Sequence, residues 1–370
     1  MTALAALTLL VWAYLLAAHG RFWQAGPVLQ AARPDVVVPV AVVVPARDEA
    51  PVIRQALASL LAQDYASLRI VLVDDGSSDG TGAIARSFAD PRLVVIDGAP
   101  RPPGWSGKLW AVAQGVESAG EAELLLLTDA DIVHEPAHVA TLVAQAERGG
   151  FDLVSEMVRL SCTSWAERLL VPAFVFFFQL LYPFAWVNDP HRGTAAAAGG
   201  TILVRRRALD RIGGIAAISG ALIDDVALAA AVKKGGRIWL GHSALARSVR
   251  SYPGVSDIWS MVTRTAYVQL RRSPGLLVAT VLAMAVVWLA PPLLALFGQG
   301  KARWIGWIVW AGLSGSYVPT LLSFGRSPLW APLLPLIAAF YTAATIGSAV
   351  NHHRGRGVAW KGRAYQGVDP

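Results

Sequence analysis

Residues 124–131 read Leu-Leu-Leu-Leu-Thr-Asp-Ala-Asp, an apolar run that ends in two carboxylates, Asp129 and Asp131. A short continuous apolar run is typical of a strand that is buried on both faces of a parallel sheet. A second run of this kind, Val40–Val44, precedes the polar residues Arg47 and Glu49. Acidic side chains that directly follow buried strands indicate an α/β protein whose ligand site lies at the ends of those strands.

Carboxylates stand in four short groups along the chain. Acidic groups at the carboxyl ends of parallel strands meet at one edge of the sheet, which is the usual ligand site of an open α/β fold. Because like charges repel one another, we expect a cation among them. Such oxygen ligands suit Mg²⁺ or Mn²⁺, which would carry a phosphorylated substrate. The four groups are Arg47-Asp48-Glu49, Asp74-Asp75-Gly76-Ser77-Ser78-Asp79-Gly80, Thr128-Asp129-Ala130-Asp131 and Asp224-Asp225.

Strand and helix signals alternate from Pro39 onward. Asp48 is placed to cap a helix in which Pro51 occupies an early position. Repeats of strand, crossover helix and strand predict a doubly wound, mostly parallel sheet of the α/β class. The expected strands are Val40–Val44, Ile70–Val73, Leu93–Ile96 and Leu124–Leu127, and the expected helices include Thr81–Phe88 and Leu109–Val116.

Two common nucleotide-binding motifs are absent from the sequence. No Gly-x-Gly-x-x-Gly opens a helix after the first strand. Gly107-Lys108 is similar to the end of a P-loop, but Pro102 replaces its first glycine and Leu109 replaces its Ser or Thr. A nucleotide would therefore have to be held by carboxylates and a metal ion.

The composition indicates a membrane protein. The chain has 370 residues, of which 55% are hydrophobic, and its mean hydropathy is +0.47. Thr2–Ala18 is an uncharged stretch, and we interpret it as a retained anchor (residues 1–20) because no basic segment precedes it, as one would in a cleaved signal peptide. Three further stretches exceed the ~20 residues that a bilayer helix needs. They are Gly275–Gly298, Trp304–Phe324 and Leu329–Val350, so that residues 21–274 form the main domain, 275–350 a membrane bundle and 351–370 a basic tail.

Basic residues near the spans predict that the main domain is cytoplasmic, in a bacterial inner membrane. Three C-terminal crossings would place the tail outside, although it is basic, so either one stretch is re-entrant or the tail breaks the rule. The net charge of +7 fits anionic lipid headgroups, and no nucleic-acid motif is present. The basic residues concerned are Arg21, Arg33, Arg264, Arg271 and Arg272 beside the domain, and Arg354, Arg356, Lys361 and Arg363 in the tail.

The apolar stretch Leu169–Val187 cannot cross the membrane if the carboxylates before and after it share one site. We therefore interpret residues 165–187 as a segment that lies in the membrane interface, with a buried core helix as the alternative. The single cysteine, Cys162, excludes an internal disulfide and suits a reducing compartment.

Four segments resemble, in order, the motifs of the family 2 inverting glycosyltransferases of the GT-A fold. A further set resembles the hopanoid-associated glycosyltransferases of bacteria, and the ceramide glucosyltransferases are more distant relatives. The first set is Val42–Glu49, Val73–Thr81, Thr128–Asp131 and Asp224–Asp225, and the second is Gly104–Val112, Pro172–Phe178, Thr194–Gly200 and Leu222–Asp225.

The resemblance implies a role for each matched residue. Asp129 and Asp131 correspond to the Asp-x-Asp motif, which holds the metal and contacts the nucleotide. Asp75, with Asp74 beside it, corresponds to the uracil or ribose contact. Asp225 corresponds to the general base, and Asp224 stands where the family has Glu. Nucleotide-sugar contacts are further implied for Pro45, Arg47, Glu49, Lys108, Gly199, Gly200 and Arg264.

Several of these residues also have a structural alternative. Asp129 and Asp225 are placed to cap helices, and Asp75 lies in a sequence that favours a loop for its own turn chemistry. Lys108, like His191 and Arg192, is either a diphosphate contact or a solvated side chain. In place of the Gln-x-x-Arg-Trp of polymer-forming relatives, this chain has Met261–Thr265, which keeps only Arg264. This difference favours transfer of a single sugar.

We therefore expect a metal-dependent enzyme that moves one sugar from a nucleotide sugar, UDP-linked by resemblance, to a membrane lipid with inversion. A hopanoid hydroxyl is the acceptor that the resemblance favours. Two alternatives stay open: transfer to a polyprenyl phosphate, and a catalytically silent scaffold that binds nucleotide sugar or lipid. A transporter is disfavoured because the three C-terminal stretches contain no charge.

Overall fold

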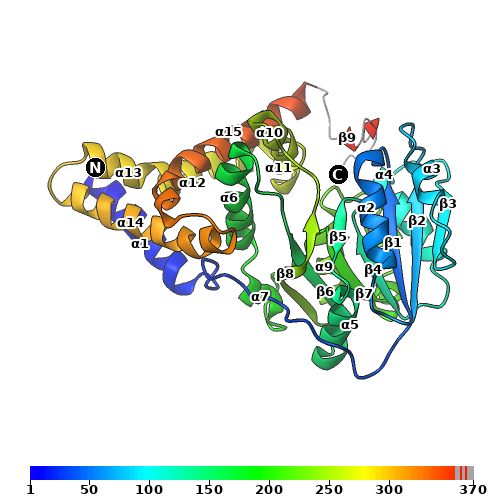
Figure 1. Cartoon of the computed structure of the whole chain (residues 1–370). Coiled ribbons are helices and arrows are strands. Elements are labelled where there is room, and N and C mark those ends of the chain that lie inside the picture. Colours follow the sequence, from blue (N-terminus) through cyan, green and yellow to red (C-terminus); the bar gives the residue numbers. More distant parts are fainter. Residues whose placement is uncertain (355–358, 361–362, 365–370) are drawn as a thin grey trace. The chain divides into compact units, whose positions relative to one another are not determined.

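The computed structural model describes residues 1–354, 359–360 and 363–364 (Figure 1). Two compact units share the chain in alternating pieces. The helical unit comprises residues 1–26, residues 162–185 and the chain from Ser251 to the end of α15 (Leu334–His353), while the sheet unit is built from residues 27–161 and 186–250. Of the predicted basic tail, Arg356 and Lys361 lie outside the described residues.

The sheet unit is built on a mixed sheet of eight strands in the order β3-β2-β1-β4-β7-β6-β8-β5. β1 pairs in parallel with β2 and β4, β2 with β3, and β6 with β8, whereas β7 runs antiparallel between β4 and β6. The predicted doubly wound, mostly parallel sheet is therefore confirmed. The strands are β1 (Val40–Ala46), β2 (Leu68–Asp74), β3 (Leu93–Asp97), β4 (Leu124–Thr128), β5 (Ile132–His134), β6 (Leu153–Arg159), β7 (Thr201–Arg205) and β8 (Ile238–Ser248), and a separate pair is formed by β9 (Ala359–Trp360) and β10 (Arg363–Ala364).

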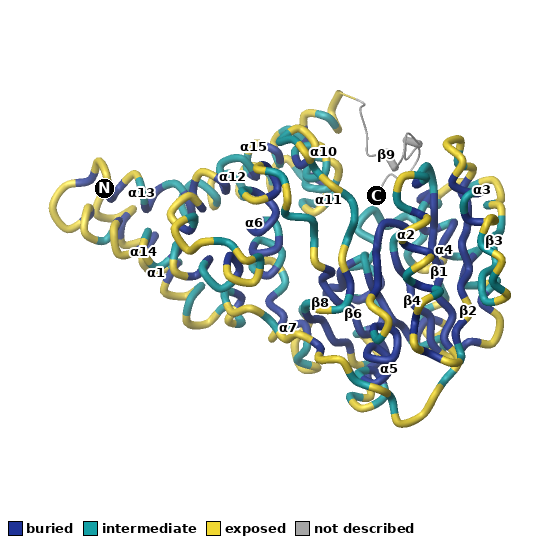
Figure 2. The backbone as a smooth tube through the Cα atoms, viewed as in Figure 1, coloured by how far each residue is buried: buried dark blue, intermediate teal, exposed yellow. Residues whose placement is uncertain are grey.

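Helices cover both faces of this sheet, so its central strands are buried along their length (Figure 2). Alternate residues of β1, such as Val42 and Val44, pack with α2 (Ala50–Leu61) and α5 (His138–Gly149) in one core. On the other face α4 (Gly107–Glu117) contacts β1 and β2, and a Cβ added at its Gly115 would lie 2.4 Å from Val43 Cγ1. This close approach fixes the start of α4 near the ends of the strands. The remaining helices of the sheet unit are α3 (Thr81–Arg86), α8 (Arg206–Arg211), η1 (Ile215–Ile218) and α9 (Asp224–Lys233), while α7 (Phe184–Asn188) lies where the two units meet in the sequence.

The predicted cap of the helix after β1 is wrong. The N-cap position of α2 is Glu49, without a side-chain cap, and Asp79 Oδ2 accepts a hydrogen bond from the Ala50 N–H at 2.9 Å. Asp48 instead has φ +50° and accepts from the N–H of Ser78 at 2.8 Å. Asp is among the few residue types that adopt a left-handed conformation at modest cost. Asp48 therefore joins the turns after β1 and β2.

The helical unit contains three helices that are long and apolar enough to cross a membrane, among the residues that the structure describes. They are Pro274–Phe297, Gly300–Ser323 and Pro328–His353, in close agreement with the predicted stretches. Thr2–Ala18 is a shorter apolar helix of 17 residues, and its Ala5 packs with Leu294 and Ala302. The helices are α1 (Thr2–Ala18), α6 (Trp165–Leu181), α10 (Val255–Thr263), α11 (Ala266–Gln269), α12 (Pro274–Met284), η2 (Ala285–Leu289), α13 (Ala290–Phe297), α14 (Gly300–Ser323), η3 (Pro328–Leu333) and α15.

α6, which lies within the predicted interfacial segment, packs in the helical unit. Phe176 is fully buried, and its ring contacts those of Trp288 and Tyr317 at centroid distances of 6.2 and 5.2 Å. The two ends of the helix, Trp165 and Leu181, are more than half exposed. Its position at the membrane interface stays a prediction.

Candidate active site

A small pocket opens at the carboxyl ends of β1 and β4 in the sheet unit. Apolar side chains line most of it, and four charged residues stand at its wall. An apolar pocket with a few convergent polar groups is the usual form of a small-molecule site. Six of the residues predicted from the sequence line it, namely Pro45, Lys108, Asp129, Gly199, Asp224 and Asp225.

Lys108 joins two of the predicted acidic groups. Its ammonium lies 3.0 Å from Asp129 Oδ1 and 3.0 Å from Asp224 Oδ2. Burial disfavours the charged ammonium, but the two carboxylates outweigh it and raise the pKa of Lys108 well above its usual range. Ser106 fixes the position of Lys108, because its Oγ accepts from the Leu109 N–H and so caps α4. Lys108 is therefore a fixed cation between strand β4 and helix α9.

Asp225 is held by backbone amides. Its Oδ2 accepts from the Gly199 N–H at 3.0 Å and its Oδ1 from the Val226 N–H at 2.8 Å. Burial and the neighbouring charge of Asp224 raise the pKa of Asp225 to about 7, against the lowering effect of Lys108. A carboxylate whose pKa lies near neutrality can take up a proton and release it at physiological pH.

Asp131 belongs to a second cluster, built around Arg250. The guanidinium donates from Nε to Asp131 Oδ2 at 2.8 Å and from Nη2 to Glu49 Oε1 at 2.7 Å. The Ser248 hydroxyl donates to the same oxygen of Asp131 at 3.1 Å. Asp131 and Glu49 are each only 7% exposed, so this cation offsets two largely buried carboxylates.

The sequence did not single out Arg250 or Ser248. Both lie at the end of β8, an edge-side strand that is far from the acidic groups in the sequence and carries no recognisable motif. The pairing of β8 with β5, which follows Asp131 directly, brings them to the site. Only this long-range strand register could have revealed them.

The loop after β2 forms a third cluster, at the end of the neighbouring strand. Asp74 and Asp75 are buried, and the Asp75 N–H donates to the Ala46 carbonyl at 2.9 Å. Arg47 lies 3.7 Å from Asp75 Oδ2 and also donates to the Asp75 carbonyl. Asp74 Oδ1 accepts from the Ser77 N–H at 3.0 Å, which is the turn chemistry that the sequence left as an alternative.

The other predicted residues are placed as follows. Gly200 directly follows Gly199 before β7, whereas Arg264 follows α10 in the helical unit. His191 and Arg192 lie in an exposed loop, where Arg192 stacks over the Trp186 ring at 5.3 Å. Within the part of the chain that the structure describes, no group of three or more His, Cys, Asp or Glu side chains is arranged to hold a metal by itself.

Residues 41–213 match the family described as Glycosyl transferase family 2. The match begins in β1 and ends in the segment after α8.

Among curated proteins, the chain is 31% identical over 108 residues to an undecaprenyl-phosphate 4-deoxy-4-formamido-L-arabinose transferase of Aeromonas hydrophila, covering 29% of this chain and 31% of that protein. It is also 31% identical over 156 residues to the succinoglycan biosynthesis protein ExoO of Rhizobium meliloti, covering 38% of this chain and 43% of that protein. The matches thus span less than half the length of these relatives.

Among solved structures, the mannosyltransferase PcManGT from Pyrobaculum calidifontis, in complex with GDP-Man and Mn²⁺, has a TM-score of 0.54 at 19% sequence identity. The match covers 93% of this chain and 99% of that one. This likeness shows the fold, which is GT-A-like. The family 2 match and the transferase name of the Aeromonas hydrophila relative support a transferase.

Proposed function

We propose that the chain is an inverting glycosyltransferase that moves one sugar from a nucleotide sugar, UDP-linked by sequence resemblance, to a hydroxyl group of a membrane lipid. The observation that carries the proposal is the group of Lys108, Asp129, Asp224 and Asp225 around one apolar pocket in a family 2 domain. The three long apolar helices support a lipid acceptor and a membrane location. The basic residues beside the spans support a bacterial inner membrane with the sheet unit in the cytoplasm. A hopanoid-type hydroxyl is the acceptor that the sequence favours.

Asp225 serves as the general base in this proposal. It takes the proton of the acceptor hydroxyl while that oxygen forms a bond to the anomeric carbon, and the bond from that carbon to the diphosphate breaks on the opposite face. Asp224 is bound to Lys108, whereas Asp225 accepts hydrogen bonds from the backbone amides of Gly199 and Val226. General-base catalysis of this kind contributes about 10²–10⁴ in rate.

Lys108 serves as an electrostatic contact for the diphosphate. Its ammonium is already fixed between two carboxylates, so it needs little reorganisation when an anionic group enters the pocket. The apolar walls of the pocket, which include Leu127 and Ile202, exclude water from the reacting atoms. Both features strengthen electrostatic interactions in the site.

The residues present fit a divalent cation, Mg²⁺ or Mn²⁺. Asp129 and Asp131 supply hard oxygen donors two residues apart, and such ions are held by one or two carboxylates when substrate phosphates complete the shell. The absence of a complete protein ligand group among the described residues agrees with this arrangement. The ion would neutralise charge that develops on the departing diphosphate.

The direct test is transfer of radiolabel from a panel of UDP-sugars into lipid extract by the full-length protein with Mn²⁺. We expect a labelled lipid whose rate of formation falls by about 10² or more in Asp225→Asn. Asp210→Asn, which changes an exposed carboxylate of α8, is the matched control and should keep full activity. Equal rates in wild type and Asp225→Asn would remove Asp225 from the role of base.

A polyprenyl phosphate is the second candidate acceptor. The similarity to a protein named as an undecaprenyl-phosphate transferase favours it. A phosphate oxygen is already anionic and needs no base, so Asp225→Asn would then keep near-normal turnover with labelled polyprenyl product. The identity of the labelled lipid and the effect of this substitution therefore separate the two acceptors.

A silent scaffold makes a different prediction. It would be stabilised against heat by UDP-sugars without any transfer of label. Asp131→Ala would weaken that stabilisation if the nucleotide is bound through Asp131. No label from any donor, together with UDP-dependent stabilisation of the wild type, would replace the transferase proposal by the scaffold.

A further inference from the structure

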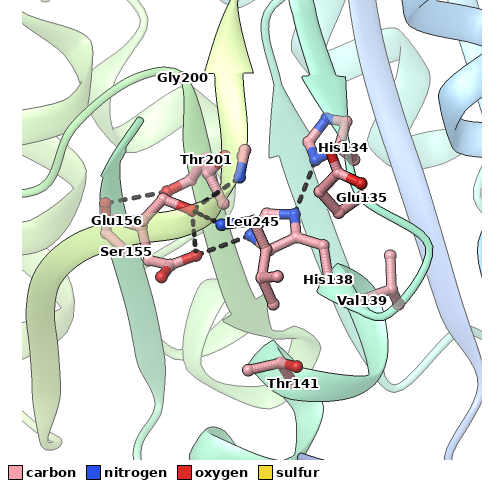
Figure 3. A network of polar contacts seen from close by, with 12 residues as sticks. His134, Glu135, His138, Val139, Thr141, Ser155, Glu156, Gly200, Thr201 and Leu245 are labelled. Carbon is pink, nitrogen blue, oxygen red and sulfur yellow. Dashed lines mark hydrogen bonds and ion pairs between the residues drawn. The ribbon is translucent and has the colours of Figure 1, made fainter. Parts of the chain in front are cut away.

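A chain of buried polar side chains joins Glu156 of β6 to the Gly200 carbonyl, and Figure 3 shows its members His134, His138 and Glu156. His138 Nε2 lies 2.6 Å from Glu156 Oε2, and its Nδ1 lies 2.7 Å from His134 Nδ1. His134 Nε2 lies 3.1 Å from Thr128 Oγ1, which lies 2.8 Å from the Gly200 carbonyl oxygen. All four side chains are at most 3% exposed. The two imidazole rings stack at a centroid distance of 5.0 Å.

The Gly200 carbonyl fixes the direction of every hydrogen bond in this chain. A carbonyl only accepts, so the single Thr128 hydroxyl proton points to Gly200, and Thr128 Oγ1 must accept from His134 Nε2–H. The neutral His134 ring then has an acceptor at Nδ1, so His138 donates from Nδ1–H. His138 therefore accepts at Nε2 in its neutral form.

Glu156 completes the chain as a protonated donor to His138 Nε2. Burial raises the pKa of Glu156 to about 8 and lowers the pKa of His138 to about 3, and both directions favour the neutral forms. Burial also lowers the pKa of His134, as does the neighbouring His138. The Ser243 hydroxyl, from β8, donates to Glu156 Oε2 at 3.2 Å. The hydrogen-bonded chain from Glu156 to Thr128 thus carries no net charge.

At its other end, the hydrogen-bonded chain contacts the backbone turn that binds Asp225. Gly200 follows Gly199, whose N–H donates to Asp225 Oδ2 at 3.0 Å. Ser155, the neighbour of Glu156 in β6, holds the same turn from its other side: its hydroxyl donates to the Thr201 carbonyl at 2.9 Å and accepts from the Ala198 N–H at 2.9 Å. The backbone that orients Asp225 is therefore fixed by buried hydroxyl groups of β4 and β6.

We propose that Glu156, His138, His134 and Thr128 act as positioning residues, which hold the Gly199–Gly200 turn and thereby the carboxylate of Asp225. The inference rests on the proposed function, because it takes Asp225 as the base. The mechanism described above does not use His134, His138 or Glu156, and they lie outside the pocket lining. A displaced turn would misplace Asp225 while leaving most donor contacts intact.

The first experiment compares Glu156→Gln with Glu156→Leu in the full-length protein. A carboxamide can donate to His138 Nε2 as the protonated carboxyl does, whereas Leu has a similar volume and no donor. We expect Leu to lower kcat by about tenfold or more, with the donor KM within about threefold of wild type, and Gln to keep most of the turnover. Equal loss of kcat in Glu156→Gln and Glu156→Leu would overturn the proposal, because the carboxamide keeps the donor that the hydrogen-bonded chain requires.

Asp152→Leu is the matched control. It replaces another largely buried carboxyl group of the sheet unit with Leu, and this carboxylate pairs with Arg211 at 2.7 Å. The kcat and donor KM of the folded protein should stay at wild-type values. Equal loss of kcat in Asp152→Leu and Glu156→Leu would assign both effects to general destabilisation and overturn the proposal.

The pH profile of folded protein gives a second readout. Once Glu156 loses its proton, it can no longer donate a hydrogen bond to His138 Nε2. Because the pKa of Glu156 is about 8, wild-type kcat should fall as the pH rises above about 8. Glu156→Gln has no proton to lose and should keep its kcat over that range. An alkaline fall that is the same in both proteins would contradict the proposed chain.

Hydrogen exchange separates this inference from the proposed function. Backbone amides of residues 198–201 should exchange faster in Glu156→Leu and at the wild-type rate in Glu156→Gln, and this readout needs no turnover. Unchanged exchange in Glu156→Leu would overturn the positioning role even in an active enzyme. An inactive wild type with the expected exchange pattern would contradict only the proposed function.

Discussion

Asp225 and Asp224 differ in role although they are neighbours in the sequence. The negative charge of Asp224 contributes to the raised pKa of Asp225, which is about 7, and turnover requires the deprotonated form. We expect kcat/KM to fall as the pH drops below about 7 in the wild type. Asp224→Asn removes the like charge, lowers the pKa of Asp225, and should move this fall to lower pH.

The measurement is kcat/KM from pH 5.5 to 8, because this ratio reports the titration of the free enzyme. Asp210→Asn should leave the midpoint unchanged, since this residue lies outside the pocket lining. A midpoint that stays constant or rises in Asp224→Asn would show that another group controls the acid side of the profile.

Arg250 is the residue whose loss should expose the charge of Asp131 and Glu49. Arg250→Ala leaves two largely buried carboxylates without this cation, and we expect a loss of about 2 kcal/mol in the free energy of unfolding. Mn²⁺ should raise the melting temperature of Arg250→Ala more than that of wild type, because the metal would restore a positive charge beside Asp131.

The control for Arg250 is a surface pair. Arg33 and Asp64 are 2.6 Å apart, with side chains 83% and 62% exposed, so Arg33→Ala should cost less than about 1 kcal/mol. Denaturant unfolding measures the loss in the free energy of unfolding for both variants. Thermal unfolding with and without Mn²⁺ measures the effect of the metal on the melting temperature. Equal Mn²⁺ responses in wild type and Arg250→Ala would argue against a metal at Asp131.

At the level of elements, the position of Lys108 depends on how closely α4 approaches β1. Gly115 of α4 leaves no room for a methyl group beside Val43. Gly115→Ala should therefore lower the free energy of unfolding by about 1–3 kcal/mol through overpacking. Gly193→Ala is the matched control, because no atom lies within 4 Å of its added Cβ. A Gly115→Ala protein as stable as the control would show that α4 can shift without cost.

The elements of the parallel half followed from local sequence patterns. Strands such as Leu124–Leu127 are buried on both faces, so they appear in a single sequence as continuous apolar runs. β7 contains a short apolar run, Ile202–Val204, but its antiparallel place beside β4 depends on long-range pairing. The edge strand β5 has only three residues, and its place depends on pairing with β8. The prediction that Asp48 caps α2 was wrong for a related reason. Asp79, from the loop after β2, accepts the hydrogen bond from the Ala50 N–H instead.

The same limit applied to the candidate site. Lys108, Asp129, Asp224 and Asp225 lie beside recognisable motifs, and their convergence could be expected from strand order. Arg250, Glu156, His138 and His134 lie outside the motifs recognised in the sequence, and they meet their partners only through the fold. Their presence could not be read from local patterns.

At the scale of the whole molecule, the single Cys162 makes the membrane topology testable. In a Cys162→Ser background, Gln299→Cys places a thiol in the short turn between α13 and α14. If the sheet unit is cytoplasmic, an impermeant maleimide added to intact cells should label this thiol. Ser78→Cys, in the loop after β2, should react only after the cells are opened.

Arg354→Cys in the same background tests the number of crossings. Three C-terminal crossings place residue 354 outside, where the reagent reaches it in intact cells, and a re-entrant stretch keeps it inside. Labelling of Ser78→Cys in intact cells would reverse the proposed orientation.

The alternation of the two units along the chain has a consequence for biosynthesis. α6 leaves the ribosome after β6 but before β7 and β8, so a segment of the helical unit is made while the sheet still lacks two strands. One of these, β7, joins β4 to β6, and the sheet can close only after the ribosome has passed α6. No single cut in the polypeptide therefore releases the sheet unit as a fragment. A soluble form would need a new linker from Ser161 to Trp186 in place of α6.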